Sequence, residues 1–64
     1  MSSRYEKRFT CTDEARNAWL FELYVHGQVI VRERFDEMLQ EEIDRLRNRF
    51  IANCDLLIEA RVKN

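Results

Sequence analysis

Residues 23–31, LYVHGQVIV, decide how the chain is organised, because they hold the only glycine of a 64-residue sequence that has no proline. Turn-forming residues are so scarce that Gly27 marks the one reversal that the composition supports. Two interpretations of the stretch compete. In one, Gly27 ends a helix in a left-handed conformation and a second helix follows. In the other, His26–Gly27 is the turn of a β-hairpin between strands at 23–25 and 29–31.

The flanking sequence favours the helical interpretation. Thr12 is a candidate N-cap, and two acidic residues follow it where the helix dipole favours negative charge, so a first helix is expected over about 13–26. Apolar residues then recur in steps of three and four, which predicts a coiled-coil-like second helix over about 28–62, continuous or broken near Asn48 or 53–55. The residues of this seam are Phe35, Leu39, Ile43, Leu46, Phe50, Asn53, Leu57 and Ala60.

The expected fold is therefore an all-α helical hairpin in one small domain, residues 1–64. Residues 1–11 form a basic N-terminal arm or strand in this prediction. Their charged members are Arg4, Glu6, Lys7 and Arg8. Side chains alternate over 4–11, so a short strand in that segment stays open as an alternative to an arm or a helix extension.

The apolar residues of the first expected helix predict a second copy of the chain. Residues 15–25 hold eight apolar residues of eleven, spread around the whole helical wheel, and a helix that is apolar all round is buried on most sides. One companion helix covers only one side, so we expect a homodimer, most simply a two-fold four-helix bundle. Its predicted core is Trp19, Leu23, Phe35, Leu39, Ile43, Leu46, Phe50 and Leu57.

The residue inventory disfavours catalysis, metal binding and cofactor binding. His26 is the only histidine, both serines lie at positions 2 and 3, and one glycine cannot make a phosphate-binding loop. Cys11 and Cys54 lack C-x-x-C spacing and are expected to be free thiols in a reducing compartment. The longest apolar run is four residues, far below the roughly 20 of a transmembrane helix. We expect a cytoplasmic protein that is not an enzyme.

Protein binding is the favoured function. Eleven basic and twelve acidic residues give a net charge of −1, so no global field attracts nucleic acid or a membrane. The homodimer is expected to bind another protein as a regulator, adaptor or inhibitor, of the kind that phages and plasmids encode. Aromatic and charged positions are the candidates for that contact. They are Phe21, Tyr24, Glu37, Glu41, Arg45 and Arg49.

DNA binding is the alternative function. An N-terminal strand, a helix, the Gly27 turn and a second helix, over residues 4–45, form an order that resembles the ribbon-helix-helix repressors and antitoxins. The resemblance implies that two N-terminal strands pair across a dimer and enter the major groove of DNA. Arg4, Arg8 and Thr10 would then face the bases. The chain departs from that pattern in its net charge and in the length of its second expected helix.

Overall fold

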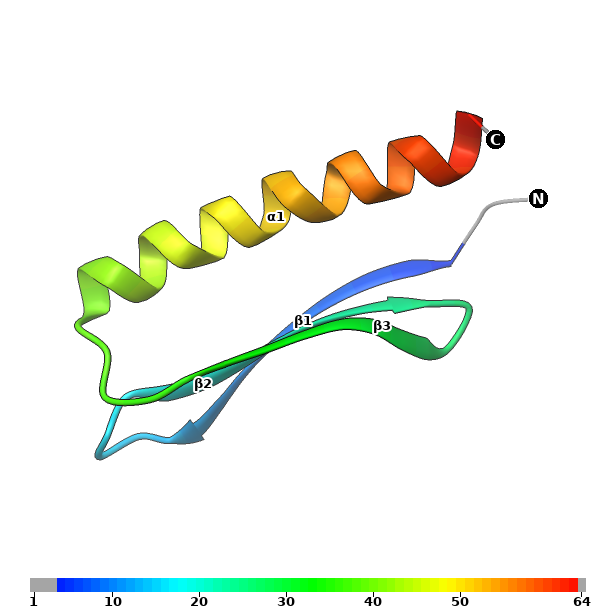
Figure 1. Cartoon of the computed structure of the whole chain (residues 1–64). Coiled ribbons are helices and arrows are strands. Elements are labelled where there is room, and N and C mark those ends of the chain that lie inside the picture. Colours follow the sequence, from blue (N-terminus) through cyan, green and yellow to red (C-terminus); the bar gives the residue numbers. More distant parts are fainter. Residues whose placement is uncertain (1–3, 64) are drawn as a thin grey trace.

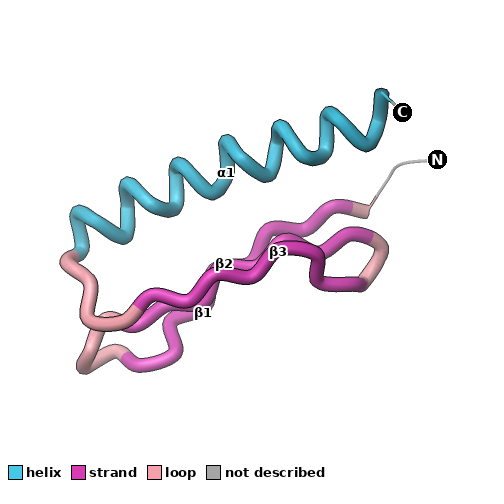
Figure 2. Tube along the Cα trace, viewed as in Figure 1, coloured by secondary structure: helices cyan, strands magenta, loops and turns pink. Residues whose placement is uncertain are grey.

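The computed structural model describes residues 4–63 and shows three strands followed by one helix (Figure 1). The strands are β1 (Tyr5–Asp13), β2 (Ala18–Val25) and β3 (Gln28–Phe35), and the helix is α1 (Gln40–Lys63). The strands form one antiparallel sheet in the order β1-β2-β3, so β2 is central. α1 lies along one face of this sheet (Figure 2). The molecule is a two-layer α+β fold whose second sheet face is uncovered.

The stretch that holds Gly27 is a β-hairpin turn. His26 and Gly27 both have positive φ angles, of 51° and 82°, which is the backbone of a two-residue type I′ turn. The backbone N–H of His26 also donates to the carbonyl of Arg4 at 2.9 Å, which ties the turn to the start of β1. The helix expected over 13–26 is therefore wrong, and the hairpin alternative is correct.

The prediction of a first helix is wrong because its apolar side chains point to both faces of a central strand. An apolar run without a clear period fits a buried strand as well as a buried helix, and aromatic and β-branched residues favour the strand. Four side chains of β2 face α1: Trp19, Phe21, Leu23 and Val25. Three others face the uncovered side: Leu20, Glu22 and Tyr24. The all-α helical hairpin and the four-helix bundle are thus wrong, since neighbouring strands and α1 cover this segment within one chain.

The expected second helix is present only in its C-terminal part. Residues 28–35 are β3, in agreement with the β-branched run at 29–31. α1 begins at Gln40, next to a cap-like hydrogen bond from the Leu39 N–H to the Glu42 carboxylate at 3.2 Å, and it continues without a break to its end. The heptad-like seam therefore packs against a sheet, and its interpretation as a coiled coil is wrong.

The N-terminal strand left open over 4–11 is present as β1. The Asp13 carboxylate at its end accepts hydrogen bonds from the backbone N–H groups two and three residues further on, at 3.1 and 3.4 Å, so this acidic residue starts a turn and not a helix. Asn17 ends the turn with a φ of 50°. Its Nδ2 donates to the Met38 carbonyl at 2.7 Å and its Oδ1 accepts from Trp19 Nε1 at 2.8 Å. The turn is thereby joined to the segment before α1.

The core lies between β2 and α1. The Phe21 ring is fully buried, with ring centroids 4.9 Å from Phe9, 5.0 Å from Phe35 and 5.6 Å from Phe50. The other buried apolar residues of the cluster are Leu23, Val25, Ile43 and Cys54.

Candidate functional site

A groove lies between α1 and β3 on the helix side of the sheet. In the part of the chain that the structure describes, α1 packs over β1 and β2, and its backbone does not approach β3. The groove has a volume of ≈ 290 Å³. Three apolar side chains, Phe35, Leu46 and Phe50, line it together with three polar ones, Glu33, Arg49 and Asn53. Its exposed lining is mainly polar, because Phe50 is buried and Phe35 and Leu46 pack partly against the core.

The periods of the two elements bring these residues together. Glu33 and Phe35 lie two residues apart in β3 and so share the helix side of the sheet. Leu46, Phe50 and Asn53 are spaced by four and three residues in α1 and so share one flank of the helix. Neither element completes the groove alone, which is why a surface of this kind depends on the pairing of β3 with β2.

Leu57 continues this surface along α1. It lies one helical turn beyond Asn53 and is 43% exposed. The start of β3 and the C-terminal half of α1 lie at the same end of the molecule (Figure 1). Val29, 39% exposed at this end, lies opposite Tyr24 and therefore on the uncovered face of the sheet. Exposed apolar area at this end is thus divided between α1 and the uncovered face.

The outer edge of β3 carries an alternating charge pattern. Arg32 and Arg34 lie on the uncovered side of the sheet, opposite Glu22 and Leu20 of β2. Glu33, between them, points to the groove side. Any strand that pairs with this edge therefore meets two guanidinium groups on one face and one carboxylate on the other.

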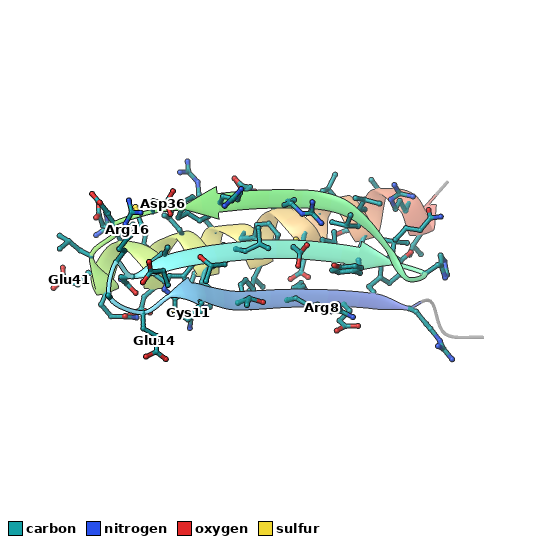
Figure 3. The ribbon with its side chains drawn as sticks, turned by 90° about the horizontal axis from the view of Figure 1, so that it is seen from below. Arg8, Cys11, Glu14, Arg16, Asp36 and Glu41 are labelled. Atoms are coloured by element: carbon teal, nitrogen blue, oxygen red, sulfur yellow. The ribbon has the colours of Figure 1, made fainter. Side chains whose placement is uncertain are left out.

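The uncovered face of the sheet is occupied by interactions among its own charges. Glu22 is only 6% exposed, and its Oε2 atom accepts from Arg32 Nη2 at 3.0 Å and from the Tyr24 hydroxyl at 3.2 Å. The Arg8 guanidinium lies 4.1 Å from the centre of the Tyr24 ring and donates to Glu6 at 2.6 Å. Figure 3 views the molecule from this side. The hydrogen bond with Arg8 lowers the pKa of the Glu6 carboxyl and raises the pKa of the Arg8 guanidinium.

The residues predicted to bind a protein partner do not form one surface. Phe21 is fully buried in the core, and Tyr24 lies on the uncovered face of the sheet. Arg49 alone lines the groove. Three others are exposed near the start of α1: Glu37, Glu41 and Arg45. Of these, Glu37 accepts a hydrogen bond from Arg16 at 3.0 Å, at the end of the molecule where Figure 3 marks Arg16 and Glu41.

The residues predicted as the core of a dimer are divided between the inside and the outside of the single chain. Three are fully or almost fully buried in its own core: Leu23, Ile43 and Phe50. Three are partly buried against that core: Trp19, Phe35 and Leu46. Leu39 and Leu57 are exposed. Most of this set therefore stabilises the monomer fold.

The residues predicted to contact DNA lie on or beside β1. Arg8 and Thr10 are on the uncovered face, paired with Glu22 and Leu20 of β2. Arg4 lines a separate hollow of ≈ 380 Å³ at the hairpin end. The segment after β1 is a strand and not a helix, so the ribbon-helix-helix arrangement is wrong for this chain.

The thiols and acidic groups do not assemble a reactive site. Cys11 and Cys54 are both free. Burial raises the pKa of the Cys54 thiol, which keeps it in the protonated, unreactive form at neutral pH. Among residues 4–63, no three histidine, cysteine or acidic side chains gather as a metal site. In the same described range, no helix has the length and apolarity to cross a membrane.

Sequence reasoning missed Glu33 as a site residue and placed Asn53 only in a helix seam. The signal for Glu33 was the alternation Arg32-Glu33-Arg34 directly after a β-branched run, which is typical of an exposed strand. The signal for Asn53 was a polar residue at an otherwise apolar position. Either signal places its residue at the groove only when residues 28–35 are known to be a strand.

No family model, curated protein or solved structure matches the chain.

Proposed function

We propose that the chain is a small non-enzymatic binding module that recognises an extended segment of another protein along the free edge of β3. The α1–β3 groove carries this proposal, because it places a hollow with charged, amide and aromatic lining residues directly beside the free edge of β3. Strand addition supplies main-chain hydrogen bonds, and side-chain pockets beside the added strand supply selectivity. Such a module would act as an adaptor or inhibitor of the protein that it binds. Its two free cysteines support a reducing compartment such as the cytoplasm.

The charges of β3 define the chemistry of the bound segment. Residues directly opposite each other on neighbouring strands interact, and unlike charges stabilise the pair. Acidic residues are favoured opposite Arg32 and Arg34, and a basic residue opposite Glu33. Apolar residues are favoured opposite Val31 and Phe35, which lie on the helix side of the sheet. The expected segment therefore reads apolar-acidic-basic-acidic-apolar over five positions.

Peptide selection on the intact chain tests this function. A random-peptide display library is enriched on the immobilised protein, and the selected peptides are sequenced and titrated against it. We expect the alternating pattern among them. The Glu33→Lys/Arg49→Glu variant exchanges two groove charges at constant net charge, and it should weaken binding of these peptides at least tenfold.

The matched control exchanges the same charges away from the groove. Glu14→Lys/Arg45→Glu has the same composition change, in the β1–β2 turn and on the exposed side of α1, and should retain binding. Far-UV circular dichroism verifies that both variants fold. Selected peptides that bind the groove variant as tightly as the original chain, or that lack the alternating pattern, would refute the proposal.

A further inference from the structure

The free edge of β1 is a second interaction surface, and its chemistry fits another copy of this chain. β1 spans nine residues, Tyr5–Asp13, and within the described part of the chain it pairs only with β2. We propose that two copies pair antiparallel through β1, around a two-fold axis at Phe9, to form a continuous six-stranded sheet with both helices on the same face. This inference uses residues separate from the α1–β3 groove and goes beyond the proposed function.

The direction of the β1 carbonyl groups shows which residues are free to pair. The Arg4 carbonyl points inward, since it accepts the His26 N–H at 2.9 Å. Backbone groups alternate along a strand, so the odd-numbered residues from Tyr5 to Cys11 present their N–H and C=O groups outward, up to the irregularity between Cys11 and Asp13. Pairing about Phe9 therefore lets Phe9 exchange hydrogen bonds with Phe9 of the second copy, and Lys7 with Cys11 of the second copy.

Charge selects this register among the symmetric alternatives. An axis at Lys7 or at Arg8 places that residue against its own copy, and like charges directly opposite are destabilising. An axis at Phe9 places Phe9 against Phe9, Lys7 against Cys11, and Arg8 against Thr10. No like charges are then directly opposite. An axis at Thr10 also avoids like pairs but gives fewer hydrogen bonds, because the strand ends sooner on one side.

The β3 edge does not allow the same self-pairing. An axis at Arg32, Glu33 or Arg34 puts each of these charges against itself. An axis at Val31 carries the pairing into the irregular start of β3, where the register with β2 shifts. Self-pairing is thus unfavourable at β3 and allowed at β1, which assigns a second copy to the β1 edge.

The position of α1 agrees with this pairing. α1 packs over β1 as well as β2. Two copies joined at β1 therefore place their helices two to three inter-strand spacings apart, which is about 10–14 Å. Packed helices lie about 8–10 Å apart. Long side chains on the facing flanks of the two antiparallel helices can therefore reach each other once the strands pair.

The flank of α1 above β1 is complementary to itself. The Arg47 guanidinium lies over the rings of Phe9 and Trp19, at 5.9 and 5.6 Å, and Asp55 pairs with Lys7 at 3.0 Å, so both residues are on the flank of α1 that faces away from the groove. Ile51 lies midway between them, four residues from each. In the antiparallel pair, Ile51 meets Ile51 near the axis, and Arg47 of each copy approaches Asp55 of the other.

Arg47 is incompletely paired within one chain. Among residues 4–63, its nearest carboxylate is Asp44, at 3.8 Å from Nη2, and its buried Nε atom has no hydrogen-bond partner. A carboxylate from a second helix would supply the guanidinium with a closer anionic partner. The β3 edges and grooves remain on the two outer sides of the dimer, so each copy keeps its own groove.

Sedimentation of the intact chain and two matched variants tests the interface. The original chain should dimerise reversibly. Ile51→Glu brings two carboxylates together at the axis and should weaken dimerisation about 100-fold. Ala52→Glu adds the same charge at the next, exposed position and should leave it unchanged. A chain that stays monomeric to roughly 1 mM, or a dimer that Ile51→Glu does not weaken, would overturn the inference.

Cross-linking tests the register. Lys7→Cys should form an intermolecular disulfide with Cys11 of the second copy under mild oxidation, since directly opposite residues lie about 5.5 Å apart. Within one chain, positions 7 and 11 are about 13 Å apart along the strand. Glu6→Cys lies on the other face and should cross-link far more slowly. Equal or faster cross-linking of Glu6→Cys would contradict the Phe9 register. The sedimentation and cross-linking results do not depend on peptide binding at the groove. Dimerisation through β1 and peptide binding at β3 can therefore be refuted independently.

Discussion

The His26–Gly27 turn yields the sharpest test of the fold, because adjacent substitutions should change stability in opposite directions. An alanine side chain at Gly27 would meet no atom within 4 Å, so the effect of Gly27→Ala arises from the backbone alone. Holding a non-glycine residue in the left-handed region costs about 1–2 kcal/mol, and the stiffer unfolded chain returns about 0.4–1 kcal/mol. We expect a net loss of about 1 kcal/mol, or about 4–8 °C in Tm.

His26→Asn should have the opposite effect. His26 has a φ of 51°, and asparagine adopts this conformation more readily than other non-glycine residues. Asn-Gly is also a preferred pair for a type I′ turn. We expect a gain of about 0.5 kcal/mol. At the end of a helix the same change would give no gain, because histidine and asparagine have similar helix propensities.

Urea unfolding measures both effects. Trp19 is the only tryptophan and is partly buried against the core, so its fluorescence reports tertiary structure while far-UV circular dichroism reports the backbone. Coincident transitions of the two signals justify a two-state free energy. Gly27→Ala as stable as the original chain, together with no gain from His26→Asn, would refute the type I′ turn.

Three further predictions concern the core, the turn before β2 and alkaline pH. Phe21→Ala should cost about 3–5 kcal/mol, comparable with the whole stability of about 3–10 kcal/mol expected at this length, so circular dichroism at 25 °C should show a largely unfolded chain. Asn17→Gly keeps the positive φ but removes both amide hydrogen bonds, and urea titration should show a loss of about 1–2 kcal/mol. Burial raises the pKa of the Cys54 thiol in the folded chain. The stability that the protonated thiol contributes is therefore complete below the pKa of the unfolded chain, and it is lost as pH rises through the pKa of the folded chain. Unfolding free energies should fall from about pH 9 upward, by at most about 1.4 kcal/mol per pH unit from this thiol, and Cys54→Ala should remove that part of the slope.

The sequence predicts part of the fold, and the remainder was ambiguous for a physical reason. The seam from Ile43 onward has a helical period and forms α1, because a long segment with one apolar stripe has few alternatives. Residues 18–25 have no such stripe. Their apolar side chains point all round, and the same composition satisfies a buried helix and a central strand. The strand forms because residues 18–25 pair with β1 on one side and β3 on the other. The composition of residues 18–25 alone does not contain that pairing.

The candidate site was harder to predict than the helix, since it exists only between elements. Arg49 was identified from its charge, whereas Glu33 has meaning only when β3 is a strand whose alternate residues face the helix. Phe21, selected as an anchor for a partner, is the centre of the chain's own core. Aromatic residues identify contact surfaces only after the burial of each one is known.

The correction of the fold also changes the physical basis of a dimer. The expected homodimer depended on apolar residues of 15–25 that one companion helix could not cover. β1, β3 and α1 now cover most of them, so core area no longer requires a second chain. What remains is a difference between two strand edges: charges oppose self-pairing at β3, and at β1 they allow it. A dimer joined at β1 would therefore be a reversible association of folded chains, with unfolding that depends only weakly on protein concentration. An obligate helical bundle would instead unfold with a strong concentration dependence, and thermal unfolding across a hundredfold dilution distinguishes the two.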